Sequence, residues 1–394
     1  MAEAPQRRLK ICMIGTGVAP IPPERGGGVE RVVFNLAKGL TELGQEVLVI
    51  DTKGGSEGGI RFKRVLAPKL RGLGKLSPIL TELLFAFLAL PRARGLRKEV
   101  DLFHVHTSMC GFVFAFFKEL LGKPLVYSSY NPDWSLPPSE LPSPSRLMMR
   151  IEGFCIRRAD AVIASSEAAA QGMAGLNPPF VIHNFVDAQT FSPRRSRFKE
   201  KLGILGPMVL FVGKLTPAKG VGYLLRAAKK VVEQRPDVKF VLVGPTSFLG
   251  EGRNPWKELQ RSLGLEENVI FTGGLHFNEL LEAYASADIF VLPSLKEAFS
   301  TVVLEAMAFG LPVVATKIPG IMEAVAEENG ILVEKGEVDQ LAEAILSLAE
   351  NDRERKRKGA NSRRRVLKYF TVEQAARKHL EVYRKVLGQR RGNN

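Results

Sequence analysis

Two carboxylates with seven residues between them, Glu297 and Glu305, have the type and spacing best suited to chemistry in this chain. Between them lies Phe299-Ser300-Thr301, a segment that follows an apolar run and precedes a helical pattern. Carboxylates accept hydrogen bonds from sugar hydroxyls, whereas backbone N–H groups at a helix start favour phosphates. The pattern therefore predicts a site for a phosphorylated sugar. Backbone N–H groups of Phe299, Ser300 and Thr301 would hold the phosphates.

The surrounding sequence predicts a strand, a loop, a helix and a second strand. Ile289–Pro293 is typical of a buried parallel strand, Ser300 of a helix N-cap, Thr301–Phe309 of a short helix and Gly310 of its end. Leu311–Thr316 is the next expected strand. In an open parallel sheet, ligands bind beyond the carboxyl ends of the strands, where this loop would lie.

Two lysines occur in a second loop between a strand and a helix, Gly213-Lys214-Leu-Thr-Pro-Ala-Lys219-Gly220. Ammonium groups placed there can lie beside phosphates and stabilise a departing diphosphate. Lys214 and Lys219 are therefore candidate catalytic residues together with Glu297.

Glu-x7-Glu followed by Ala-Met-Ala-x-Gly-x-Pro-Val-Val resembles the donor-site signature of the retaining GT-B glycosyltransferases, in particular glycosyltransferase family 4. The resemblance implies that Glu297 contacts the donor sugar and that Glu305 binds the nucleotide ribose. The lysine loop is similar to the family's Gly-Arg-Leu-x-x-x-Lys-Gly motif, whose two cations clamp the donor diphosphate. Lys214 replaces the arginine, so the bidentate fork is lost there.

Three further segments resemble parts of the family's substrate site. Arg25-Gly26-Gly27-Gly28-Val29-Glu30-Arg31 is similar to a glycine loop that faces the donor phosphates and acceptor. Asn184-Phe-Val-Asp and Pro319-Gly320-Ile-Met-Glu are similar to its Asn-Gly-Val-Asp and Gly-Gly-x-x-Glu segments, each with one glycine lost. These resemblances imply substrate-binding roles for Gly27, Gly28, Asn184 and Gly320, with turns or helix caps as the alternative.

His104 and His106 alternate at the end of a predicted strand, which could suggest a metal site. The pair has no carboxylate or cysteine companions, so we expect no metal. Family members often carry His-x-His here, which implies that His106 is a substrate-binding hydrogen-bonder and His104 is structural. Many relatives also place a histidine after the next strand, where this chain has Ser128-Ser129, so a general base at that position is in doubt.

Strands regularly separated by amphipathic helices predict a doubly wound α/β fold in two halves. The expected domains are 1–190, which would hold the acceptor, and 191–371, which would hold the donor. The turn-forming segment from Phe191 to Arg197 is the expected linker. The resemblance implies GT-B architecture, with two Rossmann-like domains facing a cleft and a C-terminal helix, about 372–394, crossing back to the first domain.

Composition describes a globular chain of 394 residues, 45% hydrophobic and 25% charged. The three cysteines lack metal-ligand spacing and suggest a reducing cytoplasm, and no signal-peptide pattern opens the chain. A net charge of +15 calls for an anionic partner. No nucleic-acid-binding motif occurs, so we expect no nucleic acid partner.

A cation-rich segment suggests a membrane surface as one candidate partner. An apolar stretch, Leu76–Leu90, is bracketed by cations, with Glu82 as the single acid. The cations are Arg61, Lys63, Arg64, Lys69, Arg71, Lys75, Arg92, Arg94, Arg97 and Lys98. Such a helix suits a peripheral position on an anionic membrane, where a lipid-linked acceptor would fit. The alternative is an ordinary core helix with a solvated charge run.

Together these features predict a retaining hexosyltransferase of the EC 2.4 class, using a UDP-, GDP- or ADP-linked sugar and no metal or other cofactor. Its acceptor would be lipid-linked or a cell-surface glycan. The alternatives are a soluble sugar or sugar-phosphate acceptor, or a non-catalytic nucleotide-sugar binder.

Overall fold

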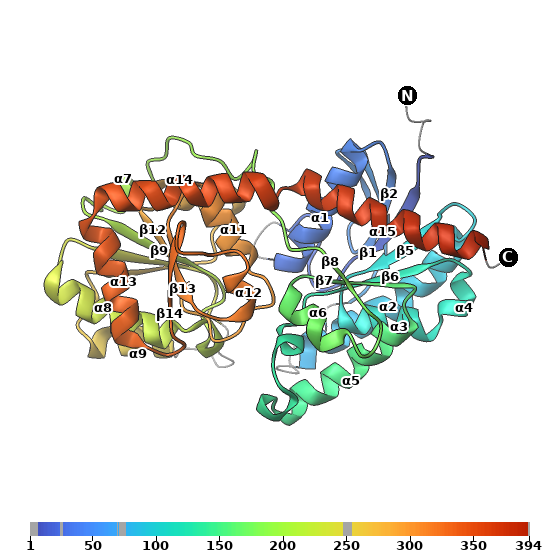
Figure 1. The fold of residues 1–394 in the computed structure, drawn as a ribbon, viewed down its shortest axis with the longest axis horizontal. Helices are drawn as coiled ribbons and strands as arrows, with labels where there is room; N and C mark the ends of the chain where they lie inside the picture. Colours follow the sequence, from blue (N-terminus) through green and yellow to red (C-terminus); the bar gives the residue numbers. More distant parts are fainter. Residues whose placement is uncertain (1–6, 24–26, 69, 71–75, 247–253, 393–394) are drawn as a thin grey trace. The chain divides into compact units, whose positions relative to one another are not determined.

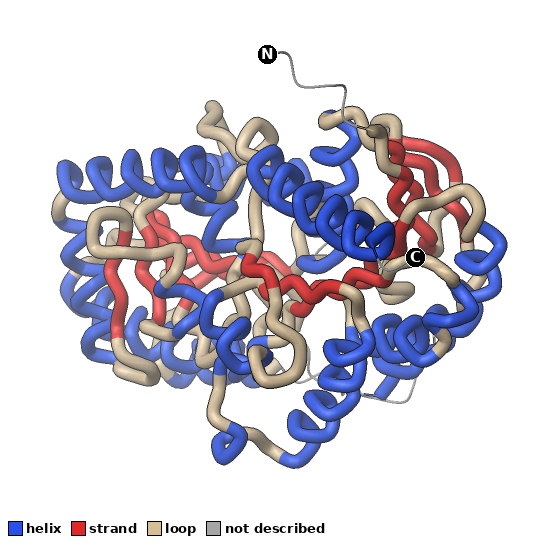
Figure 2. Tube along the Cα trace, turned by 45° about the vertical axis from the view of Figure 1, so that its right-hand side comes forward, coloured by secondary structure: helices blue, strands red, loops and turns tan. Residues whose placement is uncertain are grey.

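A computed structural model describes residues 7–23, 27–68, 70, 76–246 and 254–392, which form two compact units. Within these residues, unit 1 contains 7–23, 27–184 and 372–392, and unit 2 contains 185–371. The chain thus leaves unit 1 at Asn184 and returns to it at Val372 (Figure 1). In Figure 2 the strands of each unit lie inside and helices lie outside.

Unit 1 is built on an eight-stranded sheet of order β3-β4-β2-β1-β5-β6-β7-β8, parallel except for the β3–β4 pair. Its strands are β1 (Lys10–Ile14), β2 (Glu46–Asp51), β3 (Gly55–Glu57), β4 (Ile60–Arg64), β5 (Leu102–Val105), β6 (Leu125–Ser129), β7 (Ala161–Ala164) and β8 (Phe180–Val181). Its helices are α1 (Gly28–Glu42), α2 (Leu76–Leu96), α3 (Ser108–Phe116), α4 (Lys118–Leu121), α5 (Ser143–Arg158), α6 (Glu167–Met173) and α15 (Val372–Gly392), with 3₁₀ turns η1 (Pro132–Ser135) and η2 (Pro138–Glu140). Helices α1 and α15 cover one face of this sheet, and α2, α3 and α5 lie on the other (Figure 1).

Unit 2 is built on a parallel six-stranded sheet of order β11-β10-β9-β12-β13-β14. Its strands are β9 (Met208–Val212), β10 (Lys239–Val243), β11 (Val269–Gly273), β12 (Ile289–Leu292), β13 (Val313–Thr316) and β14 (Gly330–Val333). Its helices are α7 (Phe198–Lys201), α8 (Val221–Gln234), α9 (Pro255–Ser262), α10 (Phe277–Ser286), α11 (Thr301–Ala308), α12 (Pro319–Met322), α13 (Val338–Glu350) and α14 (Asp352–Tyr369), with the 3₁₀ turn η3 (Pro217–Lys219).

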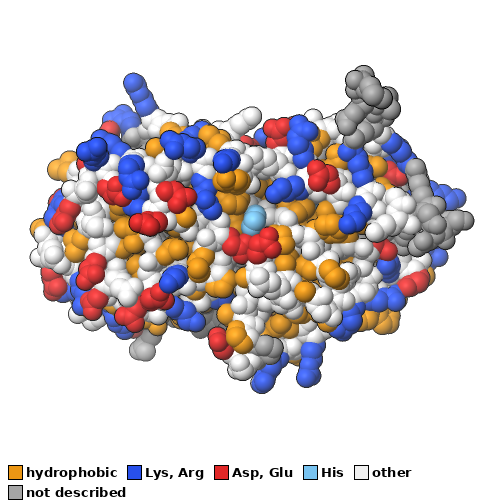
Figure 3. Space-filling model, in the orientation of Figure 1, with side chains coloured by type: hydrophobic (Ala, Val, Ile, Leu, Met, Phe, Trp, Pro, Cys, Tyr) orange, Lys and Arg blue, Asp and Glu red, His pale blue; other side chains and the backbone are white. Residues whose placement is uncertain are grey.

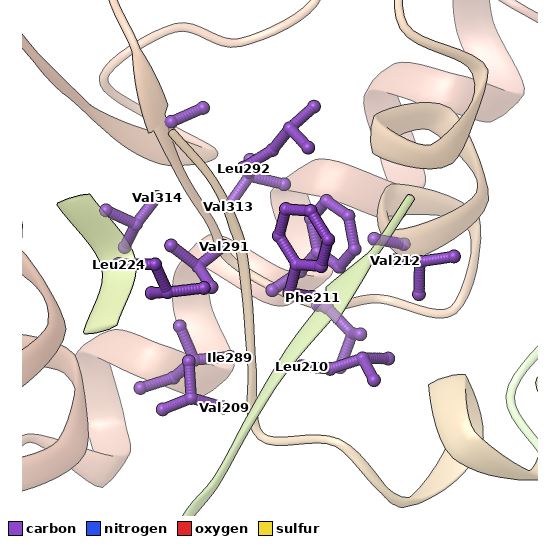
Figure 4. Close-up of a cluster of buried hydrophobic side chains, with 14 of the residues drawn as sticks. Val209, Leu210, Phe211, Val212, Leu224, Ile289, Val291, Leu292, Val313 and Val314 are labelled. Carbon is purple, nitrogen blue, oxygen red and sulfur yellow. The ribbon is translucent and has the colours of Figure 1, made fainter. Parts of the chain in front are cut away.

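The core of unit 2 explains why its strands are continuous apolar runs. Both faces of the sheet are covered, so Val209, Leu210 and Phe211 are all fully buried although they point alternately to opposite faces. Figure 4 shows side chains of β9, β12 and β13 gathered with Leu224 of α8 in this core. The predicted doubly wound α/β class is confirmed in both units.

The expected linker at Phe191 is wrong in its position. Phe191 is 1% exposed and its ring contacts Phe277, Tyr284 and Phe309 at centroid distances of 5.9, 6.2 and 6.2 Å. The segment from Phe191 to Arg197 belongs to unit 2, and the units divide at Asn184–Phe185. The prediction failed because the segment is mostly polar and turn-forming, whereas its single aromatic residue, Phe191, attaches it to the core of unit 2.

Candidate functional site

The predicted chemical residues of unit 2 lie on three loops that follow β9, β12 and β13. Strand β9 is flanked by β10 on one side and β12 on the other, so the strand order reverses direction between β9 and β12. At such a reversal the loops on the two sides diverge and leave room for a ligand beyond the carboxyl ends of the strands. Because β9 and β12 are neighbours, the lysine loop and the Glu297 loop lie next to each other at the carboxyl edge of the sheet.

Lys219 and Glu297 form an ion pair within this location. The Lys219 ammonium donates to Oε1 of Glu297 at 2.5 Å, and the Ser294 hydroxyl donates to the same oxygen at 2.7 Å. The Glu297 side chain is 10% exposed and that of Lys219 is 29% exposed. The sequence analysis assigned both residues to ligand binding but did not predict that they contact each other. It also missed Ser294, although the Ser-x-x-Glu spacing was a signal for its hydrogen bond to Glu297.

Two glycines allow the three loops to approach each other. Gly220 has φ +72°, and a Cβ there would lie 1.9 Å from the carbonyl oxygen of Pro293. Gly320, at the start of α12, would place a Cβ 2.4 Å from the carbonyl oxygen of Glu297. The Leu295 N–H also donates to the Ala218 carbonyl at 2.9 Å. The Gly320 motif thus acts by close backbone packing against the Glu297 loop.

Glu305 is held inside helix α11 by a tyrosine that sequence reasoning missed. Its side chain is buried, with the residue 4% exposed, and Oε2 accepts a hydrogen bond from the Tyr284 hydroxyl at 2.9 Å. The Tyr284 ring stacks on Phe309 at 5.6 Å. Tyr284 lies in the amphipathic helix α10, where an aromatic residue is expected in any core, so the sequence carried no signal for this contact.

The remaining predicted residues of unit 2 differ in exposure. Lys214 is exposed, and among the described residues it makes no ion pair. Phe299 is buried, with its ring 5.5 Å from that of Phe370. Ser300 occupies the N-cap position of α11 as predicted, but its side chain makes no capping hydrogen bond there, and Thr301 begins the helix. Backbone N–H groups at this helix start remain the groups suited to an anion.

A second group of predicted residues belongs to unit 1. Gly27 is the N-cap of α1 with φ +75°, and Gly28 begins the helix with open space around it. Arg25 and Gly26 lie outside the described residues. Behind this turn the buried Glu30 accepts a hydrogen bond from the Thr16 hydroxyl at 2.6 Å. Asn184 is buried at the last position of unit 1.

His106 follows β5 and is buried, with 1% exposure. Its Nδ1 lies 3.2 Å from the Tyr130 hydroxyl, and its Nε2 has no hydrogen-bond partner within the described part of the chain. Burial, with a smaller effect of His379, lowers the pKa of His106 to about 3. The ring is therefore neutral near pH 7 and offers one nitrogen for a hydrogen bond.

His104, which is predicted to be structural, is fully enclosed. Nδ1 pairs with the Tyr383 hydroxyl of α15 at 2.7 Å, and Nε2 pairs with the Ser128 hydroxyl at 2.8 Å. Burial is the main cause that lowers the pKa of His104 well below its usual value.

Ser128 and Ser129, at the end of β6, are both interior residues. The Ser129 hydroxyl donates to the fully buried Glu152 at 2.5 Å, as does the Tyr127 hydroxyl at 2.9 Å. Asn131 donates to the other Glu152 oxygen at 2.8 Å. The Ser128 and Ser129 hydroxyls thus stabilise buried polar groups of unit 1.

Across the described ranges, no three His, Cys, Asp or Glu side chains are grouped so that they could hold a metal ion. The three cysteines, Cys12, Cys110 and Cys155, are free and buried.

Comparison with known proteins places the two units in related families. Residues 194–365 match the family model of glycosyl transferases group 1, and residues 26–190 match that of glycosyltransferase family 4. A D-inositol 3-phosphate glycosyltransferase of Xylanimonas cellulosilytica is 28% identical over 96% of this chain and 97% of that protein. Among solved structures, sucrose-phosphate synthase from Thermosynechococcus elongatus has a TM-score of 0.81 at 24% identity, covering 97% of this chain and 100% of that one. HepE of Anabaena, in complex with UDP and glucose, has a TM-score of 0.77 at 24% identity, covering 96% of this chain and 100% of that one.

Proposed function

Because its two halves match these models over 26–190 and 194–365, the chain belongs to glycosyltransferase family 4, and we propose that it transfers a hexose from a nucleotide sugar with retention of configuration. The Lys219–Glu297 pair, at the point where the strand order of unit 2 reverses, is the observation that supports this donor site. HepE, a structural neighbour, was solved with UDP and glucose, so a UDP-linked sugar is the first donor to test.

In the proposed complex each group of unit 2 has one task. Glu305 accepts hydrogen bonds from the ribose hydroxyls, and the backbone N–H groups at the start of α11 hold the diphosphate. Lys214 and Lys219 oppose the charge that grows on the diphosphate as it leaves. Oε1 of Glu297 is already engaged by Lys219 and Ser294, so we assign the hexose hydroxyls to Oε2.

The proposed reaction needs no strong base. The bond between the sugar C1 and the diphosphate oxygen breaks, and the acceptor oxygen bonds to C1 on the same face. The acceptor proton passes to the departing phosphate oxygen. Two lysines and a helix N-terminus supply positive field at the leaving group, so the proposal includes no metal or other cofactor.

The acceptor is assigned to unit 1, with His106 and the Gly27–Gly28 turn as its candidate contacts. Neutral His106 can accept or donate a hydrogen bond to a hydroxyl. A lipid-linked or cell-surface acceptor is our first candidate. A soluble acceptor is the second, favoured by the names of the inositol phosphate and sucrose-phosphate relatives. The free, buried cysteines support a cytoplasmic site of action.

Thermal unfolding with UDP-, GDP- and ADP-sugars tests the donor site. A ligand that binds only the folded state raises Tm by mass action. We expect a rise with one nucleotide sugar in the wild type and in Glu258→Gln, an exposed control on α9, and a loss of that rise in Glu305→Gln. The absence of any rise in a folded wild type would contradict the proposal.

Product analysis tests the chemistry separately. Proton NMR of the product made from an α-linked donor should show an α anomer, whereas a β anomer would exclude retention. Binding without transfer to any lipid-linked or soluble acceptor would leave the non-catalytic alternative.

A further inference from the structure

Unit 1 exposes large apolar side chains on neighbouring helices. Phe87 of α2 is 48% exposed, Phe116 of α3 is 57%, Leu120 of α4 is 41% and Leu147 of α5 is 58%. Helix α3 packs against both α2 and α5, so these side chains belong to one side of the unit. We call this surface the α2–α5 face. Large apolar side chains gathered on one exposed surface mark an interaction site.

A chain of aromatic rings makes the α2–α5 face continuous. The Phe87 ring lies 6.4 Å from that of Phe117, which lies 4.9 Å from that of Phe116. The Phe116 ring lies 6.4 Å from that of Phe154 on α5, and Phe112 lies 5.6 Å from Phe154. The inner members, Phe112, Phe117 and Phe154, pack against the core, which fixes the outer rings of Phe87 and Phe116 in place.

Helix α5 carries the charge that accompanies these rings. Leu147, Ile151 and Phe154 recur at the spacing of one helical face. A second row of exposed side chains, Arg146, Arg150 and Arg157, runs beside it. In Figure 3, Lys and Arg side chains project at the lower margin, where Figure 1 places α5. Apolar and cationic rows side by side are the pattern of an interfacial helix.

The acids of α2, α3, α4 and α5 do not offset this charge. Glu82 accepts hydrogen bonds from the N–H groups of Met109 and Cys110, and Glu152 is fully buried. Glu119 is exposed and pairs with Arg158. Sequence reasoning set Glu82 against the neighbouring cations, but this residue is half-buried and its carboxylate is engaged by two backbone N–H groups, so it offsets their charge less than the composition indicates. Lys69, Arg71 and Lys75 lie outside the described residues.

We propose that the α2–α5 face docks unit 1 on an anionic phospholipid bilayer, with Phe87, Phe116 and Leu147 at the headgroup boundary and the arginines of α5 on lipid phosphates. By length and composition α2 could cross a membrane, and 28% of its most apolar stretch is buried. Its inner side, including Phe85, Ala89 and Ala93, is fully buried in the core of unit 1, so α2 lies in the plane of the surface. A symmetric dimer formed through the α2–α5 face would place the same arginines of the two copies close together, and their repulsion disfavours a second copy as the partner of this face.

Vesicle co-sedimentation tests the proposal. The wild type should bind vesicles of phosphatidylcholine with phosphatidylglycerol and bind pure phosphatidylcholine more weakly. Phe87→Ser/Phe116→Ser should reduce partitioning to both by at least about tenfold, because two rings no longer enter the interface. Arg150→Gln/Arg157→Gln should reduce binding to the anionic vesicles by roughly twenty-five-fold, since each cation near such a surface contributes about fivefold.

Matched controls in unit 2 separate this surface from general effects. Leu205→Ser removes a leucine that is 99% exposed, and Lys257→Gln/Arg353→Gln removes two exposed cations; both should bind like the wild type. Circular dichroism should show that every variant is folded, and donor-dependent thermal shifts should be unchanged. No vesicle binding by the wild type, or equal loss in the control variants, would overturn the proposal. A dimer in solution that Phe87→Ser/Phe116→Ser abolishes would also overturn it, by making the face a contact between copies.

Discussion

Lowering the pH from 7 to 5.5 should weaken unit 1 selectively, because three of its histidines are buried and neutral. Burial lowers the pKa of His106 to about 3, that of His379 to about 4 and that of His104 well below its usual value. In the unfolded chain each has a pKa near about 6.5. As the pH falls, the unfolded state therefore binds protons that the folded state does not bind. The stabilisation from these neutral histidines is fully present above about pH 6.5 and is lost as the pH falls toward their folded-state pKa values.

The expected loss follows from these values. Between pH 7 and 5.5, a histidine shifted from about 6.5 to 4 or lower costs about 1.3 kcal/mol of unfolding free energy. His106 and His379 together give about 2.5 kcal/mol, and His104 acts in the same direction. Burial also raises the pKa of Asp51 and of Glu82, and protonation of these carboxyls favours the folded state as the pH falls. The net loss in unit 1 is therefore smaller than the sum of the histidine contributions.

The two tryptophans of the chain separate the units. Trp134 is buried in unit 1 and Trp256 in unit 2, each 8% exposed. Urea unfolding followed by fluorescence would report unit 1 in Trp256→Phe and unit 2 in Trp134→Phe. We expect unit 1 to lose about 2 kcal/mol between the two pH values and unit 2, which holds none of the three buried histidines, to lose little.

A variant that removes one titrating group provides the control. In His379→Gln the loss of stability between pH 7 and 5.5 should shrink by about 1.3 kcal/mol, whatever the substitution costs at pH 7. Equal stability of unit 1 at both pH values, or an unchanged loss in His379→Gln, would refute the reasoning.

Three substitutions probe other contacts. Gly220→Ala should destabilise unit 2 by about 2 kcal/mol or more, seen in Trp134→Phe urea curves, because its Cβ would meet the Pro293 carbonyl oxygen at 1.9 Å with φ +72°; a wild-type curve would contradict this. Tyr284→Phe should weaken nucleotide-sugar binding several-fold in calorimetry while costing about 1 kcal/mol of stability, since Glu305 loses its 2.9 Å hydrogen bond; unchanged affinity would remove Tyr284 from the site. Glu152→Gln should cost unit 1 about 2 kcal/mol in urea unfolding, because an NH₂ group replaces one of the two oxygens that accept from Tyr127, Ser129 and Asn131. A neutral result would show that the cluster tolerates an amide.

The strands were the most predictable part of the fold. A parallel strand buried on both faces is a continuous apolar run, so the sequence predicts Leu311–Thr316 and the structure has Val313–Thr316. The same argument predicts Ile289–Pro293, where β12 covers Ile289–Leu292. Helix α11 ends one residue earlier than predicted, because Phe309 is already its C-cap.

Contacts between distant segments were not predictable. The Lys219–Glu297 pair depends on how closely Gly220 packs on Pro293, which follows from the β9–β12 neighbourhood and not from either motif alone. Ser128 pairs with His104 of β5 and Ser129 with Glu152 of α5, and neither partner follows from the local pattern around the two serines. Local patterns give the type of a side chain and its element, but a partner is fixed only when the sheet order is known.

The attachment of α15 to unit 1 has a consequence for synthesis. The His104–Tyr383 hydrogen bond joins residues 279 positions apart. His104 of β5 therefore cannot form this bond until almost all described residues have been translated. Unit 2 is continuous from 185 to 371 and has its full set of strands before α15 emerges from the ribosome. The usual order of N-terminal domain first should therefore be reversed here, with a nascent unit 1 that exposes the α15-facing side of its sheet and is open to chaperones.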